Sequence, residues 1–166
     1  MSDQNTVGQS KGRYLGLIVF LAVSLAVSVV GGFITASSVS TWYPTLQKPP
    51  FNPPNWIFGP VWTTLYILMA IAGWRVWWLQ RQSVFASPIG LYCVQLGLNL
   101  LWSLLFFGLH TIGWALVDIL ALLATIMITT VVFWRIDRIA GLLFVPYLAW
   151  VAFASLLNAS IWWLNR

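Results

Sequence analysis

The apolar run GLLFVPYLAWVAFASLLNASIWWL, residues Gly141–Leu164, contains no charged residue over 24 positions. An α-helix needs about 20 predominantly apolar residues to cross the roughly 30 Å hydrocarbon core of a bilayer. A β-barrel strand is shorter and alternates apolar with polar residues, and this run shows no such alternation. The stretch is therefore predicted to form a transmembrane helix.

Four further apolar runs of 22 to 24 residues precede it. They cover residues 14–37, 57–79, 88–109 and 112–134, and the only charges inside them are Arg75 and Asp118. Short linkers between the later runs force neighbouring helices to pack antiparallel. We predict an all-α integral membrane protein, a bundle of five transmembrane helices that forms a single domain over residues 14–166.

The composition excludes several other classes of protein. Only 8 Lys or Arg and 3 Asp residues are charged among 166, which is far below the roughly 25% of a soluble domain. The net charge of +5 comes from scattered residues at the edges of apolar runs, a pattern that suits anionic headgroups rather than nucleic acid. One Cys and one His provide too few ligands for a zinc or iron centre, so no metal site is predicted.

Residues 1–13 (MSDQNTVGQSKGR) are polar, and we predict a short disordered arm there. The alternative is a secretory signal peptide, with residues 14–37 as its apolar region and small residues near 35–38 as its cleavage site. The apolar run is longer than the roughly 7–15 residues of a signal peptide, which favours a retained helix.

Basic residues are distributed unevenly between the two sides of the predicted bundle. Lys48 and Arg166 fall on one side, and the N-terminal side has six: Lys11, Arg13, Arg75, Arg81, Arg135 and Arg138. Because an excess of Lys and Arg marks the cytoplasmic side, the N-terminus is predicted to be cytoplasmic and the linker 38–56 to lie outside.

The linker at residues 38–56 is rich in proline and aromatic residues. Its prolines are Pro44, Pro49, Pro50, Pro53 and Pro54. Proline fixes φ and disfavours the helical region for the residue before it. We expect an extended, stiff loop that is anchored by Trp42, Tyr43 and Phe51 and covers one end of the bundle as a lid.

The 12 tryptophans divide into two groups. An indole near the end of a transmembrane helix can lie at headgroup level with its N–H in water. Nine occupy such positions: Trp42, Trp56, Trp74, Trp77, Trp78, Trp114, Trp134, Trp162 and Trp163. Trp62, Trp102 and Trp150 lie inside the runs, where the N–H needs a partner, so we predict that they face the bundle interior. They either pack the core or line a pocket for a flat hydrophobic ligand.

The run 88–109 presents two different faces if it is helical. A polar and aromatic stripe follows the spacing of one face: Tyr92, Gln95, Asn99, Trp102 and Phe106. Because buried amides in lipid are costly without partners, Gln95 and Asn99 are predicted to point inward, toward other helices or a ligand. Gly90, Cys93 and Gly97 lie on the roughly opposite face, where another backbone can approach closely. We favour a dimer partner there over an intramolecular neighbour.

The sequence has few charged residues that could act as a general acid or base. Asp118 lies about two turns into its run, and an intramembrane carboxylate is a functional candidate by default. The interpretation we favour is a structural carboxylate that accepts a hydrogen bond from an indole or backbone N–H. No second carboxylate pairs with it, and no nucleophilic set is expected, because His110 falls in a turn at the membrane edge and Cys93 in the middle of a helix.

Several motifs resemble the TspO/MBR family, the tryptophan-rich sensory proteins and translocator proteins also known as peripheral benzodiazepine receptors. The first group is Trp42-Tyr43-x-x-Leu46-x-Lys48-Pro49, Pro53-Pro54-x-Trp56 and Gly59-Pro60-x-Trp62-Thr63-x-Leu65-Tyr66. The second is Gly90-Leu91-Tyr92-x-x-Gln95-Leu96-x-Leu98-Asn99, Phe106-Phe107-Gly108 and Gly113-Trp114-Ala115-Leu116-Val117-Asp118. The third is Pro146-Tyr147-Leu148-Ala149-Trp150-x-Ala152-Phe153-Ala154 with Leu157-Asn158. The match covers nearly the whole chain from residue 14.

The resemblance implies a five-helix bundle, usually a homodimer, with a pocket beneath the loop between the first two helices. The family binds porphyrins and other tetrapyrroles, benzodiazepine-type ligands and, in some members, cholesterol. The matching positions that would form the pocket are Tyr43, Trp62, Tyr66, Asn99, Trp102, Trp150 and Ala154. Some members have a cholesterol-recognition pattern at the end of the last helix, but here Ala159 stands at its Tyr position and Trp163 at its basic position. Specific sterol binding is therefore not expected, and a bacterial-type member is indicated.

Three functions follow from this resemblance. The first is a membrane receptor or transport-type protein that binds tetrapyrroles as ligands and requires no cofactor; apart from the resemblance, we expect Lys48 in the loop to meet a propionate. The second is a light- and oxygen-dependent enzyme that degrades porphyrins, in which Trp62 and Trp150 would relay the oxidation. The third is a regulatory protein of tetrapyrrole metabolism and stress responses. In each, the partners are the lipid bilayer and a porphyrin-type molecule.

Overall fold

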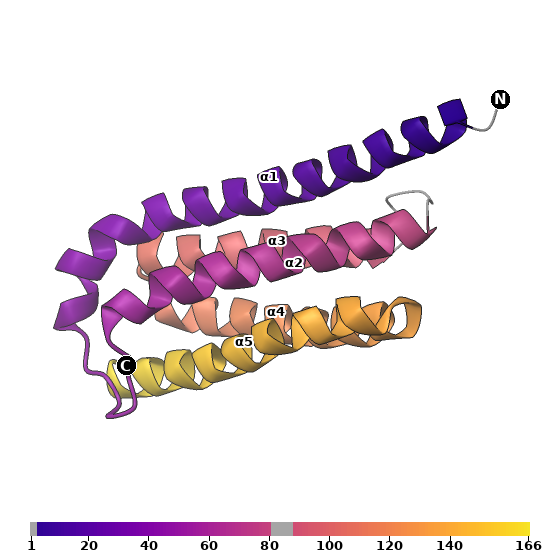
Figure 1. Ribbon diagram of the computed structural model, residues 1–166. Coiled ribbons are helices and arrows are strands. Elements are labelled where there is room, and N and C mark those ends of the chain that lie inside the picture. The colour runs from indigo at the N-terminus through magenta and orange to yellow at the C-terminus, as the bar shows by residue number, and fades with distance from the viewer. Residues whose placement is uncertain (1–2, 81–87) are drawn as a thin grey trace.

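The computed structural model describes residues 3–80 and 88–166, with side chains for residues 12–80 and 88–166. Its five long helices are α1 (Asp3–Thr41), α2 (Phe58–Gln80), α3 (Pro88–Ser103), α4 (Ile112–Ile136) and α5 (Arg138–Leu164) (Figure 1). Two 3₁₀ turns, η1 (Tyr43–Thr45) and η2 (Asn55–Ile57), and one π-helical turn, η3 (Leu104–Gly108), complete the described secondary structure. In each of the five helical regions a segment is long and apolar enough to cross a membrane. This confirms the predicted class, since a helix satisfies its own backbone polar groups in lipid.

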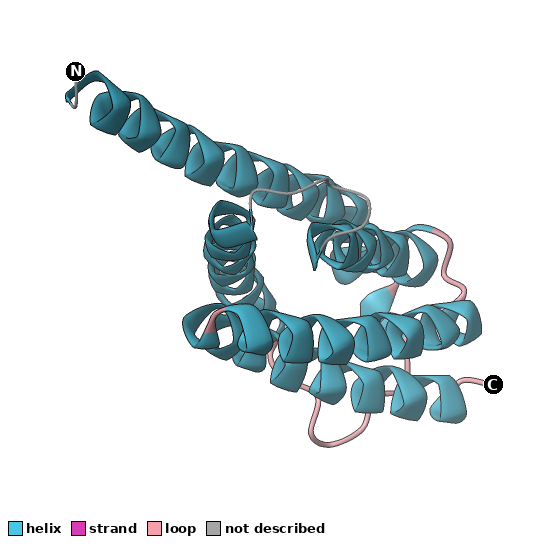
Figure 2. Ribbon diagram, turned by 90° about the vertical axis from the view of Figure 1, so that its right-hand side faces the viewer, coloured by secondary structure: helices cyan, strands magenta, loops and turns pink. Residues whose placement is uncertain are grey.

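The helices pack as a ring. Contacts between helices run in the order α1, α2, α5, α4, α3 and back to α1, and α4 and α5 share the most extensive interface. The N-terminal part of α1 projects past the other helices (Figures 1 and 2). The core lies among the other four helices, where Met69, Phe133, Phe144 and Tyr147 are fully buried. Helix α1 is the least buried span, so it forms the outer wall of one side of the ring.

The ends of α1 differ from the predicted ends. The helix begins at Asp3 and ends at Thr41, so the disordered arm predicted for residues 1–13 is wrong for residues 3–13. No proline interrupts that segment. Once a helix has formed in the adjoining apolar run, each residue added to its end gains one backbone hydrogen bond, so extending the helix is easier than starting it. Most of the predicted linker 80–87, with Arg81, lies outside the described residues. The cytoplasmic orientation of the N-terminus stays a prediction.

The predicted loop 38–56 is shorter and more structured than expected. Its first four residues continue α1, and η1 and η2 form a turn near each end. Between them the chain is extended at Leu46, with φ −74° and ψ 144°, and at Pro54, with φ −58° and ψ 141°. The extended conformation expected for the whole segment is therefore found between the two turns.

The predicted helix 88–109 changes form before its end. From Leu104 to Gly108 it becomes a π-helical turn, in which the Leu109 N–H donates to the Leu104 carbonyl at 2.8 Å. His110 then adopts a positive φ of 56°, which ends the helix and starts the turn into α4. The extra residue in the π turn changes the direction in which the following side chains point, and such turns occur often at functional sites.

The two predicted faces of α3 are confirmed. Tyr92, Gln95 and Asn99 are buried, whereas Cys93 and Gly97 are exposed. The exposed face is the one for which we predict a dimer partner, and the dimer stays a prediction.

The corner between α4 and α5 consists of one residue, Asp137, instead of the predicted linker 135–140. Its carboxylate accepts a hydrogen bond from the Ile139 backbone N–H at 3.1 Å and so caps α5. It also accepts from the Arg75 side chain of α2 at 2.5 Å. The hydrogen bond from Arg75 is the main reason that the pKa of Asp137 lies below its usual value.

Replacing Asp137 with asparagine is expected to remove a pH-dependent contribution of up to about 1 kcal/mol to stability. A carboxyl group whose pKa is lower in the folded state stabilises the protein above its unfolded pKa of about 3.9, and the contribution is lost as the pH falls through the folded value. Thermal unfolding in detergent between pH 7 and pH 3 should show the difference between wild type and Asp137→Asn shrinking below about pH 4. Asparagine also caps helices, so an equal difference at every pH would contradict the assignment.

Candidate functional site

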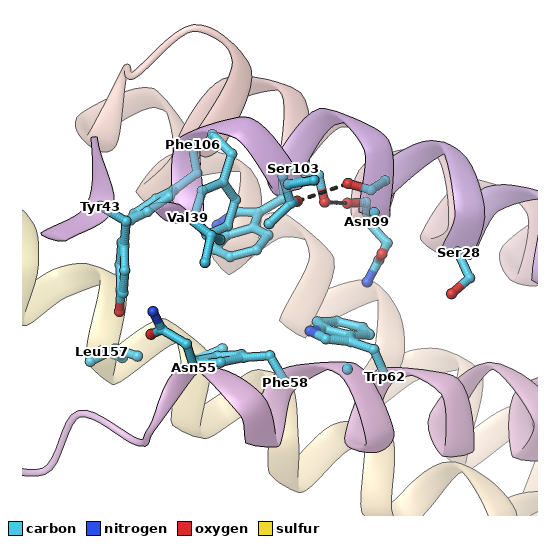
Figure 3. Close-up of a pocket in the computed structure, with 18 of the residues that line it drawn as sticks. Ser28, Val39, Tyr43, Asn55, Phe58, Trp62, Asn99, Ser103, Phe106 and Leu157 are labelled. Carbon is cyan, nitrogen blue, oxygen red and sulfur yellow. Dashed lines mark hydrogen bonds between the residues drawn. The ribbon is translucent and has the colours of Figure 1, made fainter. Parts of the chain in front are cut away.

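A cavity of about 420 Å³ lies at the loop end of the ring, between α1, α2, α3 and α5 (Figure 3). This volume falls within the roughly 300–1,000 Å³ of sites that bind small molecules. The first part of its lining is Ser28, Gly31, Gly32, Thr35, Ala36, Val39, Tyr43, Asn55, Phe58, Gly59, Trp62, Thr63 and Tyr66. The rest is Asn99, Trp102, Ser103, Phe106, Phe107, Ala154, Leu157, Asn158 and Ile161. None of these residues, all within the described part of the chain, carries a formal charge.

Aromatic rings form much of the cavity wall. Trp102 and Phe106 stack with ring centroids 5.3 Å apart and planes at 26°, and Phe106 meets Phe107 edge-on at 4.8 Å. Both phenylalanines belong to the π turn η3, and both line the cavity. On the opposite side Trp62 and Phe58 project from α2 toward the cavity (Figure 3). The site therefore has apolar faces suited to a flat aromatic molecule.

A buried chain of hydrogen bonds begins at the cavity wall. The Tyr66 hydroxyl donates to Oδ1 of Asn99 at 2.5 Å, and Nδ2 of Asn99 donates to the Tyr147 hydroxyl at 3.1 Å. The Tyr147 hydroxyl in turn donates to Oε1 of Gln95 at 2.9 Å. The chain connects α2, α3 and α5, so it both joins helices and holds the Asn99 amide at the cavity. This agrees with the predicted inward orientation of both amides.

The indole of Trp102 has the partner that burial in lipid requires. Its Nε1 donates to Oδ1 of Asn158 at 3.0 Å, and Nδ2 of Asn158 donates to the Ile112 carbonyl at 3.1 Å. The ring is thus fixed between α3, α4 and α5, with one side on the cavity.

The segment after α1 covers the water-facing end of the cavity. Tyr43 is 4% exposed, and its hydroxyl donates to Oδ1 of Asn52 at 2.6 Å. Burial raises the pKa of Tyr43 to about 12, so the phenol stays a neutral donor at physiological pH. The Lys48 ammonium lies 5.0 Å from the centroid of the Tyr43 ring, which places a cation beside the covered loop end of the cavity.

The end of α5 clamps this covering segment. The Gln47 backbone N–H donates to Oδ1 of Asn165 at 2.9 Å, and Nδ2 of Asn165 donates to the Gln47 carbonyl at 2.9 Å. Two hydrogen bonds between one side chain and one residue hold the segment over the bundle, as the predicted lid requires.

The structure brings six of the seven predicted pocket residues together around the cavity. They are Tyr43, Trp62, Tyr66, Asn99, Trp102 and Ala154. Trp150 is not among the residues that line it. Its ring packs against Phe58 at 5.9 Å and Phe153 at 5.7 Å, and it borders an open groove on the outer side of α2 and α5. The predicted inward orientation therefore does not bring Trp150 to the cavity, and its buried Nε1 has no hydrogen-bond partner among the described groups.

Helix α1 contributes a whole side of the cavity that sequence reasoning missed. Its lining residues are Ser28, Gly31, Gly32, Thr35, Ala36 and Val39. The sequence did contain a signal for this side of the cavity. Small and polar residues recur at a spacing of three or four on one face of an otherwise apolar helix. Phe106 was recognised as inward-facing, but nothing in the sequence indicated the π turn that adds Phe107.

Other chemistry-bearing side chains lie outside the cavity lining. Asp118 is 7% exposed, and its Oδ2 has no hydrogen-bond partner among the described residues, so the predicted bond to an indole or backbone N–H is not found for that atom. Cys93 is exposed on α3. Among residues 3–80 and 88–166 no group of three or more His, Cys, Asp or Glu side chains is placed to hold a metal ion.

Comparison with known proteins gives consistent results over nearly the whole chain. The model of the TspO/MBR family matches residues 20–164. A tryptophan-rich protein TspO from Archaeoglobus fulgidus is 44% identical over 154 residues, which cover 91% of this chain and 97% of that protein. The translocator protein of Homo sapiens is 41% identical over 86% of this chain and 85% of its own length. A tryptophan-rich sensory protein from Cereibacter sphaeroides is 36% identical over 89% and 90% of the two chains.

Proposed function

The chain belongs to the TspO/MBR family, and from that premise we propose that it is a membrane receptor of tetrapyrroles that binds porphyrins in its loop-end cavity. The relatives named translocator protein and sensory protein support a receptor or transport-type role. The observation that carries the choice of ligand is the cavity itself, which combines aromatic walls, the amides of Asn55, Asn99 and Asn158, and no formal charge among its described lining residues.

A porphyrin fits the chemistry of this cavity in two respects. Its macrocycle is a large flat π-system, which stacks favourably on indole and phenyl faces such as those of Trp62, Trp102 and Phe106. Its polar edge needs a hydrogen-bonding group, and the Asn99 amide retains one N–H beyond the bond that it donates to Tyr147. The tyrosine hydroxyls beside it hold that amide in place.

The anionic propionates of a porphyrin require a different environment. Burial of a carboxylate without a partner is costly, and the cavity interior offers no cation among its described lining residues. Lys48 lies beside Tyr43 at the covered loop end, where its ammonium donates to the carbonyls of Pro44 and Leu46 at 3.3 and 3.1 Å. We propose that a propionate replaces part of this bonding and takes a charge-assisted hydrogen bond from Lys48.

The test compares protoporphyrin with its dimethyl ester, using tryptophan quenching of the purified protein. Lys48→Met is expected to weaken binding of the diacid by roughly fivefold, which corresponds to about 1 kcal/mol, and to leave the ester unaffected. Arg166→Met is the matched control, because Arg166 is a cation at the same end of the bundle that stacks on Trp162 and Trp163 and does not line the cavity. A wild-type protein that neither ligand quenches would refute the proposed function, and equal losses for both ligands would refute the role of Lys48.

The alternative is a light- and oxygen-dependent enzyme that degrades the bound porphyrin. The position of Trp62 in the cavity wall favours it, since an indole in contact with a photoexcited macrocycle is exposed to oxidation. The second indole of that hypothesis, Trp150, is separated from the cavity by Phe58. We therefore propose binding as the principal function.

A further inference from the structure

The cavity is lined by buried residues on its inner side and by exposed residues on another side. The lining residues of α3, η3 and α5 that are buried form its inner wall: Asn99, Phe106, Ala154, Leu157, Asn158 and Ile161. The lining residues that are exposed are Gly32, Ala36, Asn55, Gly59 and Thr63. Four of these five lie on α1 and α2, so the exposed part of the lining is concentrated along the edge where these two helices face each other.

The packing of α1 against α2 changes along their length. At the end away from the loop the helices are in close contact, because a Cβ on Gly16 would lie 2.3 Å from the Trp77 ring and one on Gly73 would lie 2.8 Å from the Phe20 ring. At the level of the cavity, a Cβ on Gly32 or Gly59 would meet nothing within 4 Å. The helices are therefore in close contact at Gly16 and Gly73, and open space adjoins Gly32 and Gly59 at the level of the cavity.

The residues that border this opening belong to two of the candidate membrane spans. Gly32 and Ala36 belong to the candidate span Gly12–Thr41, and Gly59 and Thr63 belong to Asn55–Gln80. The small side chains at all four positions leave room for a ring to pass. Lipid chains, not water, would border the opening.

By contrast, the route from water into the cavity at the loop end is obstructed. A ligand that entered at the loop end would have to displace buried Tyr43 and its hydrogen bond to Asn52. It would also have to break the two hydrogen bonds with which Asn165 holds Gln47.

We infer that ligands enter and leave the cavity sideways from the bilayer, through a portal between α1 and α2 that is bordered by Gly32, Ala36, Gly59 and Thr63. The inference rests on the proposed function, because it names the path to the same cavity. It restricts the ligands to flat molecules that partition into the membrane, and it assigns the loop the role of a fixed cover.

The test measures the rates of protoporphyrin binding and release by stopped-flow tryptophan quenching, with the full-length protein in lipid nanodiscs. Gly32→Leu and Gly59→Leu are each expected to slow association and dissociation together, by roughly tenfold, so that the dissociation constant changes far less than either rate. Leucine favours helices more than glycine does, so both variants should fold. The matched control is Gly12→Leu, at an exposed glycine of α1 that has equally open surroundings and does not line the cavity.

A second variant tests the competing route. Asn165→Ala releases the clamp on the covering segment, and lateral entry predicts that its two rate constants equal those of wild type. Faster rates in Asn165→Ala, or portal variants whose rates match Gly12→Leu, would overturn the portal while equilibrium binding remained intact. A portal variant that loses affinity through faster release alone would also overturn it, because the glycines would then contribute contacts. Absence of equilibrium quenching in the wild type would instead overturn the proposed function, and the portal with it.

Discussion

Replacing Trp62 with alanine is expected to weaken protoporphyrin binding by roughly tenfold or more. The indole forms the α2 side of the cavity wall, and its removal takes away both a stacking surface and apolar area. A ring–ring contact contributes about 0.5–1.5 kcal/mol beyond the area that it buries, and about 1.4 kcal/mol corresponds to tenfold in affinity. Titration followed by porphyrin absorbance measures the loss without relying on the tryptophan signal that the substitution changes.

Trp150→Ala is the matched control for this prediction. Both variants remove one half-buried indole, but only Trp62 lines the cavity. We expect Trp150→Ala to bind within a few-fold of wild type. Trp62 also contacts the rings of Tyr66 and Tyr147 at 5.8 and 6.2 Å, so thermal unfolding of both variants should accompany the titration. Equal losses of affinity at the two positions would contradict the position of the cavity.

A third variant, Trp62→Phe, distinguishes binding from photo-oxidation. Under illumination in air, catalysis predicts a new tetrapyrrole absorption product that disappears in the conservative variant Trp62→Phe. Bleaching that matches free porphyrin, in wild type and variants alike, would leave binding as the function.

Replacing Asn99 with leucine is expected to lower stability by about 2 kcal/mol and to weaken ligand binding. The substitution removes the acceptor of Tyr66 and a donor to Tyr147, in a region where both rings are at most 4% exposed. A buried polar group left without its partner costs about 1–3 kcal/mol, whereas single interhelical hydrogen bonds in membranes average nearer 0.6 kcal/mol. Unfolding in detergent, followed by circular dichroism, measures the change.

The double variant Tyr66→Phe/Asn99→Leu provides the control. Because it removes both partners of the first hydrogen bond, no hydroxyl of residue 66 is left unsatisfied, and the double variant should be more stable than Asn99→Leu. Destabilisation that simply adds the effects of the two single variants would show that the hydrogen bond contributes little, and that Asn99 acts through packing alone.

The membrane class and the five helices were predictable from the sequence because each depends on local properties. Hydropathy and length decide whether a segment crosses a bilayer, and Gly141–Leu164 satisfies both without reference to any other part of the chain. The faces of α3 were equally predictable, since the 3.6-residue period relates Tyr92, Gln95 and Asn99 directly. The ends of the helices were less predictable from the sequence. Extension of a helix beyond its apolar run depends on capping and on neighbouring segments, as at Asp137.

The family resemblance named seven pocket residues, of which six line the cavity, and the seventh shows what resemblance and periodicity omit. Trp150 and Ala154 are four residues apart, which on a helix of 3.6 residues per turn rotates one relative to the other by about 40°. That rotation is enough to place Ala154 on the cavity and Trp150 beyond Phe58, once α5 has packed against α2.

By itself, then, the sequence determined that this protein lies in a membrane, how many times it crosses, and which amides and aromatic rings need partners inside. Only the tertiary structure decided that α1 supplies one side of the cavity, that a π turn brings Phe106 and Phe107 to another, and that α1 and α2 separate at Gly32 and Gly59. The physical reason is that hydropathy acts on each residue alone. A cavity instead depends on the rotation and spacing of helices, which are set by contacts between residues far apart in the chain.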